Sequence, residues 1–204
     1  MRKLKDLRRE AAEAIEDLRE YERIAGFFKI ARRALANNSF DGVLTTIGLL
    51  MGNYVSGVRD PLIVIRTGVS TSIAIGISGL WGAYLAESAE RGRELAELER
   101  VSLTDLAETK IARAGRVAVV IVSITDGLAP FVSSIIVLMP MFLVNWVGGV
   151  VIGYLFSMIL ALVTLFGLGM YLGNISGRSM VGYGLRTVIA GIVSIAFAFL
   201  LGGE

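Results

Sequence analysis

The sequence has 204 residues, of which 54% are hydrophobic and 19% charged, and its mean hydropathy is +0.68. A soluble domain is about 45–50% apolar and about 25% charged, and disordered chains are poorer still in apolar residues. Because cysteine and histidine are both absent, disulfide scaffolds and Cys/His zinc sites are excluded. The charge is uneven, since residues 1–37 hold ten of the twenty Lys/Arg. These features predict an all-α integral membrane protein with a charged cytosolic front end.

The N-terminal segment is predicted to form one helix over residues 2–36. Its apolar residues follow a heptad a/d pattern: Leu4, Leu7, Ala11, Ala14, Leu18, Tyr21, Ala25, Phe28 and Leu35. This pattern predicts a cytosolic amphipathic helix that packs on the membrane domain or on a partner copy, and the alternative is a helix lying flat on anionic lipid. Asn37, Asn38 and Ser39 offer helix-capping chemistry. We expect residues 1–37 to be this cytosolic helix and residues 38–204 to be the membrane domain.

Five apolar stretches follow, each close to the ~20 residues that a membrane-spanning helix needs. They cover about residues 40–58, 62–85, 117–139, 147–172 and 185–201. A turn at 59–61, an uncharged connection at 140–146 and a Gly/Ser-rich loop at 173–184 join them, and a polar helical insert at 86–116 follows span two. A cytosolic N-terminus puts eighteen of the twenty Lys/Arg on the cytosolic side. The positive-inside rule therefore predicts five spans in the cell membrane, with the C-terminus outside.

Internal similarities predict a duplicated membrane domain. Asp41 in the first span and Asp126 in the third are each followed by glycine, at an offset of 85 residues. The segments 82–85 (GAYL) and 169–172 (GMYL) match at an offset of 87. Two tandem two-helix repeats followed by a fifth helix explain both matches, and duplicated halves are common in transporters. Chance similarity between glycine-rich apolar helices is the alternative.

Asp41 and Asp126 are the strongest functional candidates. Each is a carboxylate in apolar sequence, and a carboxylate at membrane depth costs about 2.5–3.5 kcal/mol on insertion scales. Such a group needs a partner or water, so we predict an ion or proton site. The alternatives are a helix cap for Asp41, which lies near the end of its span, and a buried structural hydrogen bond for Asp126. Pro130, four residues further on, removes one helical hydrogen bond nearby.

Further groups are candidates for a cation site. Asn53 supplies an amide oxygen and Met51 a thioether, although methionines here are more often packing residues. Four glutamates recur at helical spacing after the second span, so they share one face that would concentrate cations from the cytosol: Glu87, Glu90, Glu94 and Glu97. The alternative is a solvated face neutralised by Arg91, Arg93 and Arg100.

Other function classes have little support in the sequence. It contains no nucleophile–base pair, P-loop or nucleotide fingerprint, so we expect neither enzymatic activity nor a bound cofactor. The basic residues are matched by acids, so nucleic acid is not an expected partner.

The first predicted span resembles that of the vacuolar iron transporter family. Residues 41–52 read DGVLTTIGLLMG, where members of that family typically read DGLVSTFGLVAG. Residues 78–85 (SGLWGAYL) are similar to a degraded form of the family motif SMAAGEYLS, and residues 173–191 are similar to its last loop and last span. The chain departs from the family where Gly79 replaces methionine and Ala83 replaces glutamate.

This resemblance implies a five-span homodimer with the ion path between the copies, which exports iron or manganese from the cytosol in exchange for protons. It carries over Asp41 as the first-span carboxylate and residues 86–116 as the segment that collects metal. Because two metal-contacting side chains are replaced and Asp126 is additional, an all-oxygen site would suit a harder cation. We expect a dimeric transporter with a divalent cation as its substrate. The alternative is a non-transporting membrane interaction protein on the same fold.

Overall fold

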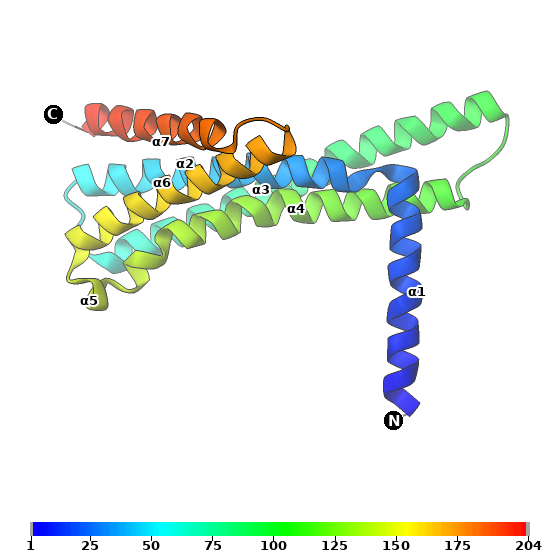
Figure 1. Cartoon of the computed structure of the whole chain (residues 1–204), viewed down its shortest axis with the longest axis horizontal. Helices are drawn as coiled ribbons and strands as arrows, with labels where there is room; N and C mark the ends of the chain where they lie inside the picture. The colour runs from blue at the N-terminus through cyan, green and yellow to red at the C-terminus, as the bar shows by residue number, and fades with distance from the viewer. Residues whose placement is uncertain (1, 203–204) are drawn as a thin grey trace. The chain divides into compact units, whose positions relative to one another are not determined.

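The protein is described by a computed structural model over residues 2–202, with side chains for residues 13–146 and 148–201. All regular structure in that range is helical: α1 Arg2–Ala25, α2 Phe27–Val55, α3 Pro61–Ser102, α4 Lys110–Phe142, α5 Val144–Val147, α6 Val150–Ile175 and α7 Met180–Gly202 (Figure 1). Among the described residues, α3, α4, α6 and the Met180–Leu201 part of α7 are long and apolar enough to cross a bilayer. The chain is an all-α, multi-pass membrane protein.

The predicted single helix over residues 2–36 is wrong, because the chain breaks at Gly26. This glycine has φ +62°, a left-handed conformation that costs other L-residues about 1–2 kcal/mol. The Glu22 carboxylate accepts a hydrogen bond of 2.9 Å from the Phe28 N–H and so caps the start of α2. The predicted cap at residues 37–39 is also wrong, since these residues lie inside α2.

Elsewhere, α3 and α4 extend beyond the boundaries that hydropathy predicts. The polar insert at 86–116 is not a separate element, because α3 continues unbroken to Ser102 and α4 begins at Lys110. The connection predicted at 140–146 is shorter, since α4 runs through Pro140 to Phe142 and α5 follows. Hydropathy marks where a helix is apolar, whereas backbone hydrogen bonding continues through polar residues until a turn stops it.

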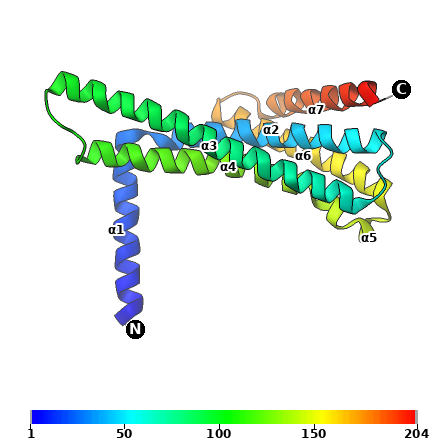
Figure 2. The same cartoon turned by 180° about the vertical axis from the view of Figure 1, so that it is seen from behind.

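Contacts divide the chain into two units: Met1–Arg33 with Leu80–Thr125 (unit 1), and Ala34–Gly79 with Asp126–Glu204 (unit 2). In unit 1, the C-terminal end of α1 meets the segments of α3 and α4, and the rest of α1 points away from them (Figures 1 and 2). Its core contains buried Phe27, Ala31, Ala118 and Val122, with Leu18, Tyr21 and Ala25 of α1 packed on it. Lys110 donates to both carboxylate oxygens of Glu20, at 2.7 and 2.8 Å, and this interaction raises the pKa of Lys110.

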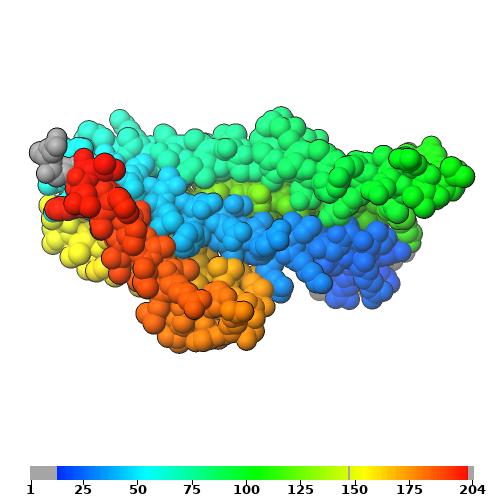
Figure 3. All heavy atoms as spheres, turned by 90° about the horizontal axis from the view of Figure 1, so that it is seen from above, coloured from blue at the N-terminus to red at the C-terminus, as the bar shows by residue number. Residues whose placement is uncertain are grey.

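Unit 2 has the larger apolar core, formed by four helices: Val43, Ile47, Leu50, Met51, Val64, Val137, Leu138, Met141, Tyr154, Ala161 and Leu165. Its α7 packs against α6 and is visible along the surface in Figure 3. Gly169 permits this contact, because a Cβ there would lie 2.7 Å from the Cα of Gly184. Thr187 also donates a 2.7 Å hydrogen bond to the Leu165 carbonyl. Gly169 therefore serves helix packing within the chain.

Candidate functional site

A pocket of about 410 Å³ in unit 2 brings the two candidate aspartates together. The lining residues come from α2, α3 and α4: Asn38, Asp41, Ala74, Ile75, Ser78, Gly79, Asp126 and Pro130. The two carboxylates are separated by 85 residues in the sequence, yet they line one cavity. Asp41 is exposed to this space and Asp126 is half-buried.

Glycines allow the three helices to approach closely around this pocket. A Cβ on Gly42 would lie 2.5 Å from the carbonyl oxygen of Pro130, and one on Gly79 would lie 2.7 Å from that of Asp126. A Cβ on Gly76 would lie 3.1 Å from the Gly127 carbonyl oxygen. Because ordinary van der Waals contacts begin near 3.4 Å, side chains at Gly42 or Gly79 would force α2 or α3 away from α4. These glycines therefore determine how near the two carboxylates lie to each other.

Buried hydroxyls hold α2 against α4 beside the pocket. Ser39 donates to the Ala129 carbonyl at 3.4 Å, Ser133 donates to the Ser39 carbonyl at 3.0 Å, and Ser134 donates to the Gly42 carbonyl at 3.0 Å. Each such bond between membrane helices is worth about 0.6 kcal/mol on average. These three hydroxyls form hydrogen bonds between α2 and α4, so we assign them a structural role. The residues that line the pocket are the candidates for its chemistry.

The interpretation of Asp41 as a helix cap is wrong, because the residue lies in the middle of α2. That continuity also explains why Asn38 was missed as a pocket residue. Positions i and i+3 share a helix face, so Asn38 and Asp41 face the same space once the segment is one helix. Ser78 was missed because its placement depends on the packing of α3 on α4. Carboxylate, amide and hydroxyl oxygens are the ligands of hard cations such as Mg²⁺ and Ca²⁺.

Met51 and Asn53, the other predicted ligands in this region, lie outside the pocket. They follow Asp41 by ten and twelve residues, which corresponds to about 15 and 18 Å along the helix axis. Met51 is 8% exposed and packs in the core of unit 2. Asn53 donates a 3.0 Å hydrogen bond to the Leu49 carbonyl. The structure supports the packing interpretation for Met51 and gives Asn53 a backbone partner.

The glutamates of α3 alternate with arginines in unit 1. Arg91 lies 2.9 Å from Glu94 and 3.7 Å from Glu87, and Arg93 lies 2.9 Å from Glu90. Within the described residues, no group of three or more acidic side chains is arranged to hold a metal ion. Glu87, Glu90 and Glu94 therefore lie beside arginines of their own helix, which agrees with the alternative interpretation for these three residues. The recruitment of cations by the stripe of Glu87, Glu90, Glu94 and Glu97 stays a prediction.

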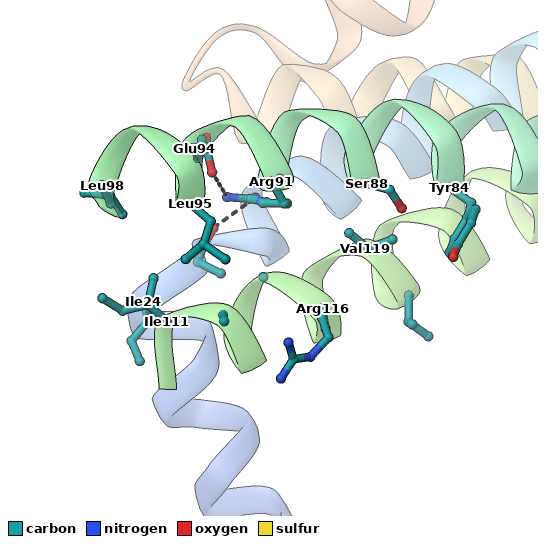
Figure 4. Close-up of a pocket in the computed structure, with 15 residues that line it drawn as sticks. Ile24, Tyr84, Ser88, Arg91, Glu94, Leu95, Leu98, Ile111, Arg116 and Val119 are labelled. Carbon is teal, nitrogen blue, oxygen red and sulfur yellow. Dashed lines mark hydrogen bonds and ion pairs between the residues drawn. The ribbon is translucent and has the colours of Figure 1, made fainter. Parts of the chain in front are cut away.

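The same region of unit 1 contains an open apolar groove of about 480 Å³ between α3 and α4 (Figure 4). Its walls include Leu95, Leu98 and Ile111. The side chain of Arg91 is 17% exposed there and donates a 3.2 Å hydrogen bond to the carbonyl of Ala25, the last residue of α1. Arg91 thus connects the end of α1 to α3, a role that the sequence did not indicate.

Comparisons with known proteins identify no family. No protein-family model matches the chain. An uncharacterized protein of the archaeon Methanocaldococcus jannaschii is 28% identical over 169 residues, which cover 80% of this chain and 84% of that protein. The resemblance to vacuolar iron transporters therefore rests on the motifs in the sequence alone. The comparisons establish similarity to an archaeal protein along most of both chains.

Proposed function

We propose that this protein is a divalent metal cation transporter that exports its substrate from the cytosol in exchange for protons. The observation that supports this proposal is the single pocket lined by Asp41 and Asp126. Asp126 lies in α4, which is long and apolar enough to cross a bilayer, and Asp41 lies in α2, which we propose as a further span. Charged groups at membrane depth are generally found on ion or proton pathways. Iron and manganese are the substrates that the family resemblance suggests, and the all-oxygen lining would also suit a harder cation.

The donor set suits passage of an ion better than permanent binding. Two carboxylates with the Ser78 hydroxyl and the Asn38 amide offer four ligand groups, and even with both carboxylates bidentate they only reach the lower end of the six to eight oxygens that a bound Ca²⁺ takes. A cation held there would keep several water molecules, and conduction requires binding that is weak enough to release. When the cation leaves, a carboxylate oxygen of Asp41 or Asp126 would take a proton, which couples the two movements. The two aspartates would therefore bind both the cation and the exchanged proton.

The proposed topology has five spans, with α2 added to the four helices of sufficient length and hydropathy. The uneven distribution of arginines and lysines supports a topology with the N-terminus in the cytoplasm and the C-terminus outside the cell membrane. The α2 span carries Asp41, Asn38 and Asn53, and these polar groups lower its hydropathy. We include a homodimer in the proposal because the family resemblance implies one, with the ion path between the two copies.

The glutamates of α3 have a weaker role in this proposal than the pocket does. Residues 86–102 contain five glutamates against three arginines, so the segment keeps a modest negative charge. Such a charge raises the local concentration of cations. We assign this segment to attraction of cations from the cytosol and place no fixed metal site on it.

The second candidate function is a non-transporting membrane interaction protein. The observation that favours it is the ion pairing of Arg91 and Arg93 with the same glutamates that would recruit metal. Gly79 and Ala83 also replace two side chains that contact metal in the resembling family. A stoichiometric protein partner that binds independently of divalent cations would support this candidate.

Flux measurements test the transport proposal. The purified chain is reconstituted in liposomes, and uptake of Fe²⁺, Mn²⁺, Mg²⁺ and Ca²⁺ is followed together with internal pH. We expect transport of at least one cation with opposite proton movement, and loss of both in Asp41→Asn and in Asp126→Asn. Asp60→Asn is the matched control, because Asp60 lies in the α2–α3 turn and accepts a hydrogen bond from the Leu62 N–H. Normal flux in either pocket variant, or no flux of any cation in the unmodified protein, refutes the proposal.

A further inference from the structure

The groove between α3 and α4 in unit 1 crosses the level at which both helices change from apolar to polar sequence. Residues 80–85 of α3 read LWGAYL, and the glutamates begin at residue 87. In α4 the basic residues end at Arg116, and residues 117–124 read VAVVIVSI. Because α3 and α4 are both long and apolar enough to cross a bilayer, this change marks the level of the lipid headgroups along the groove.

Two aromatic side chains mark the same level. The rings of Trp81 and Tyr84 lie 5.8 Å apart, and both residues are exposed. Tryptophan and tyrosine are enriched at membrane–water interfaces, because each ring combines an apolar body with one polar group. Tyr84 also lines the groove, at the end opposite Leu98 (Figure 4). The Tyr84 end of the groove therefore adjoins the bilayer.

The charged groups of the groove include one cation without an acidic partner. The lining contains three charged residues: Arg91, Glu94 and Arg116. Arg91 and Glu94 pair with each other at 2.9 Å. Within the part of the chain that the structure describes, no ion pair includes Arg116, whose guanidinium donates a 3.4 Å hydrogen bond to the Ala107 carbonyl. Arg113, one turn earlier on α4, adds a second exposed cation nearby. The groove thus complements an anion at the headgroup level.

Small residues leave room in the groove at this level. Gly92 and Gly115 line it from opposite helices. A Cβ on Gly92 would meet nothing within 4 Å, and one on Gly115 would come within 3.8 Å of the Arg91 Cβ, which is ordinary contact. Ser88 adds a hydroxyl to the same lining. A polar headgroup could therefore enter between the two helices beside Arg116.

We propose that this groove binds one anionic phospholipid. The lipid phosphate lies against the Arg116 guanidinium, where the Ser88 hydroxyl offers a further donor, and an acyl chain runs along Tyr84, Val119 and Val120 into the bilayer. Arginine suits this contact because its planar set of donors matches the geometry of a phosphate. Basic pockets between membrane helices bind anionic lipid headgroups in this way. The proposal does not depend on transport, because it involves no residue of the pocket that holds the two aspartates.

Fluorescence of Trp81 tests the proposal, because Trp81 lies beside Tyr84 and the chain contains one other tryptophan, Trp146. The full-length Trp146→Phe variant is reconstituted in phosphatidylcholine vesicles that contain small fractions of phosphatidylglycerol with brominated acyl chains, which quench nearby tryptophan. We expect brominated phosphatidylglycerol to quench Trp81 with an apparent affinity about fivefold higher than that of brominated phosphatidylcholine. Equal quenching by the two lipids would overturn the proposal.

Substitution of Arg116 separates the groove from general surface charge. In the Trp146→Phe background, Arg116→Gln should abolish the preference for phosphatidylglycerol, with helix content checked by circular dichroism. Arg100→Gln is the matched control, because Arg100 is exposed and lies outside the groove lining, and this variant should keep the preference. If the two variants are quenched alike, Arg116 does not hold the lipid and the proposal is wrong.

Inorganic phosphate distinguishes a lipid from a free anion. Excess phosphate should leave the quenching by brominated phosphatidylglycerol unchanged, because the acyl chain along Val119 and Val120 contributes to binding. Loss of the preferential quenching when phosphate is added, but not when the same ionic strength is reached with chloride, would identify the groove as a site for the free anion and would also overturn the proposal.

Discussion

Replacement of Gly42 by alanine should separate α2 from α4 and measurably destabilise the protein. The new Cβ would lie 2.5 Å from both the carbonyl oxygen of Pro130 and the hydroxyl oxygen of Ser133. Both neighbours are buried, and the first belongs to the backbone, so α2 must move away by about an ångström to restore ordinary contact. That displacement lengthens the seam hydrogen bonds made by Ser39, Ser133 and Ser134.

The magnitude follows from three terms. Overpacking a well-packed site costs about 1–3 kcal/mol, and three weakened hydrogen bonds add up to about 2 kcal/mol at 0.6 kcal/mol each. The higher helix propensity of alanine returns about 1 kcal/mol. We therefore expect Gly42→Ala to lower the free energy of unfolding by about 2–4 kcal/mol.

Reversible unfolding in mixed detergent micelles, followed by circular dichroism, measures this change. Gly48→Ala is the matched control on the same helix, because a Cβ at that position has nothing within 4 Å. Its free energy of unfolding should stay the same or rise. If Gly42→Ala is as stable as Gly48→Ala, the close packing of α2 on α4 is refuted as the arrangement that positions the two aspartates.

Three further substitutions test other parts of the structure. Gly79→Ala should reduce cation flux in liposomes, because its Cβ would push α3 away from α4 at the pocket, whereas Gly82→Ala, whose Cβ has open space, should transport normally. Arg91→Ala should destabilise the protein by about 1–3 kcal/mol through lost charged hydrogen bonds and speed amide exchange at the end of α1. Arg93→Ala is the control, because the exposed ion pair of Arg93 should contribute at most about 1 kcal/mol. Equal effects of the two variants would contradict this difference. Gly26→Ala should cost about 1–2 kcal/mol from left-handed strain alone, so unchanged thermal stability would show that the helix break does not need this conformation.

The membrane class and the approximate helices were predictable from local features. Each apolar stretch falls largely within one helix, and the connection between α2 and α3 covers residues 56–60, close to the turn predicted at 59–61. The boundaries were less predictable, because α3 and α4 continue as helices through polar residues that hydropathy assigns to a separate insert. The break at Gly26 was missed since the heptad pattern continues across it, while a single left-handed residue interrupts the backbone.

For the candidate site, the sequence identified some of the residues but did not show which of them lie together. Asp41 and Asp126 were identifiable from the sequence because each is an isolated carboxylate in an apolar segment. Met51 and Asn53 were selected by ligand chemistry, but helix geometry places them about 15 and 18 Å along the axis from Asp41. The ion pairs of Glu87 and Glu94 depend on where the Arg91 side chain lies, and Arg91 also donates a hydrogen bond to the Ala25 carbonyl at the end of α1.

Composition and periodicity by themselves established an all-α membrane protein and singled out the two aspartates, because the cost of placing charge among apolar residues depends on the local sequence alone. The common pocket of Asp41 and Asp126, and the inclusion of Asn38 and Ser78 in it, required the packing of α2 and α3 on α4. That packing depends on glycines and hydroxyls that match one another across helices distant in the sequence. Such complementarity involves the surfaces of two helices at once, so it cannot be read from the sequence of either helix alone.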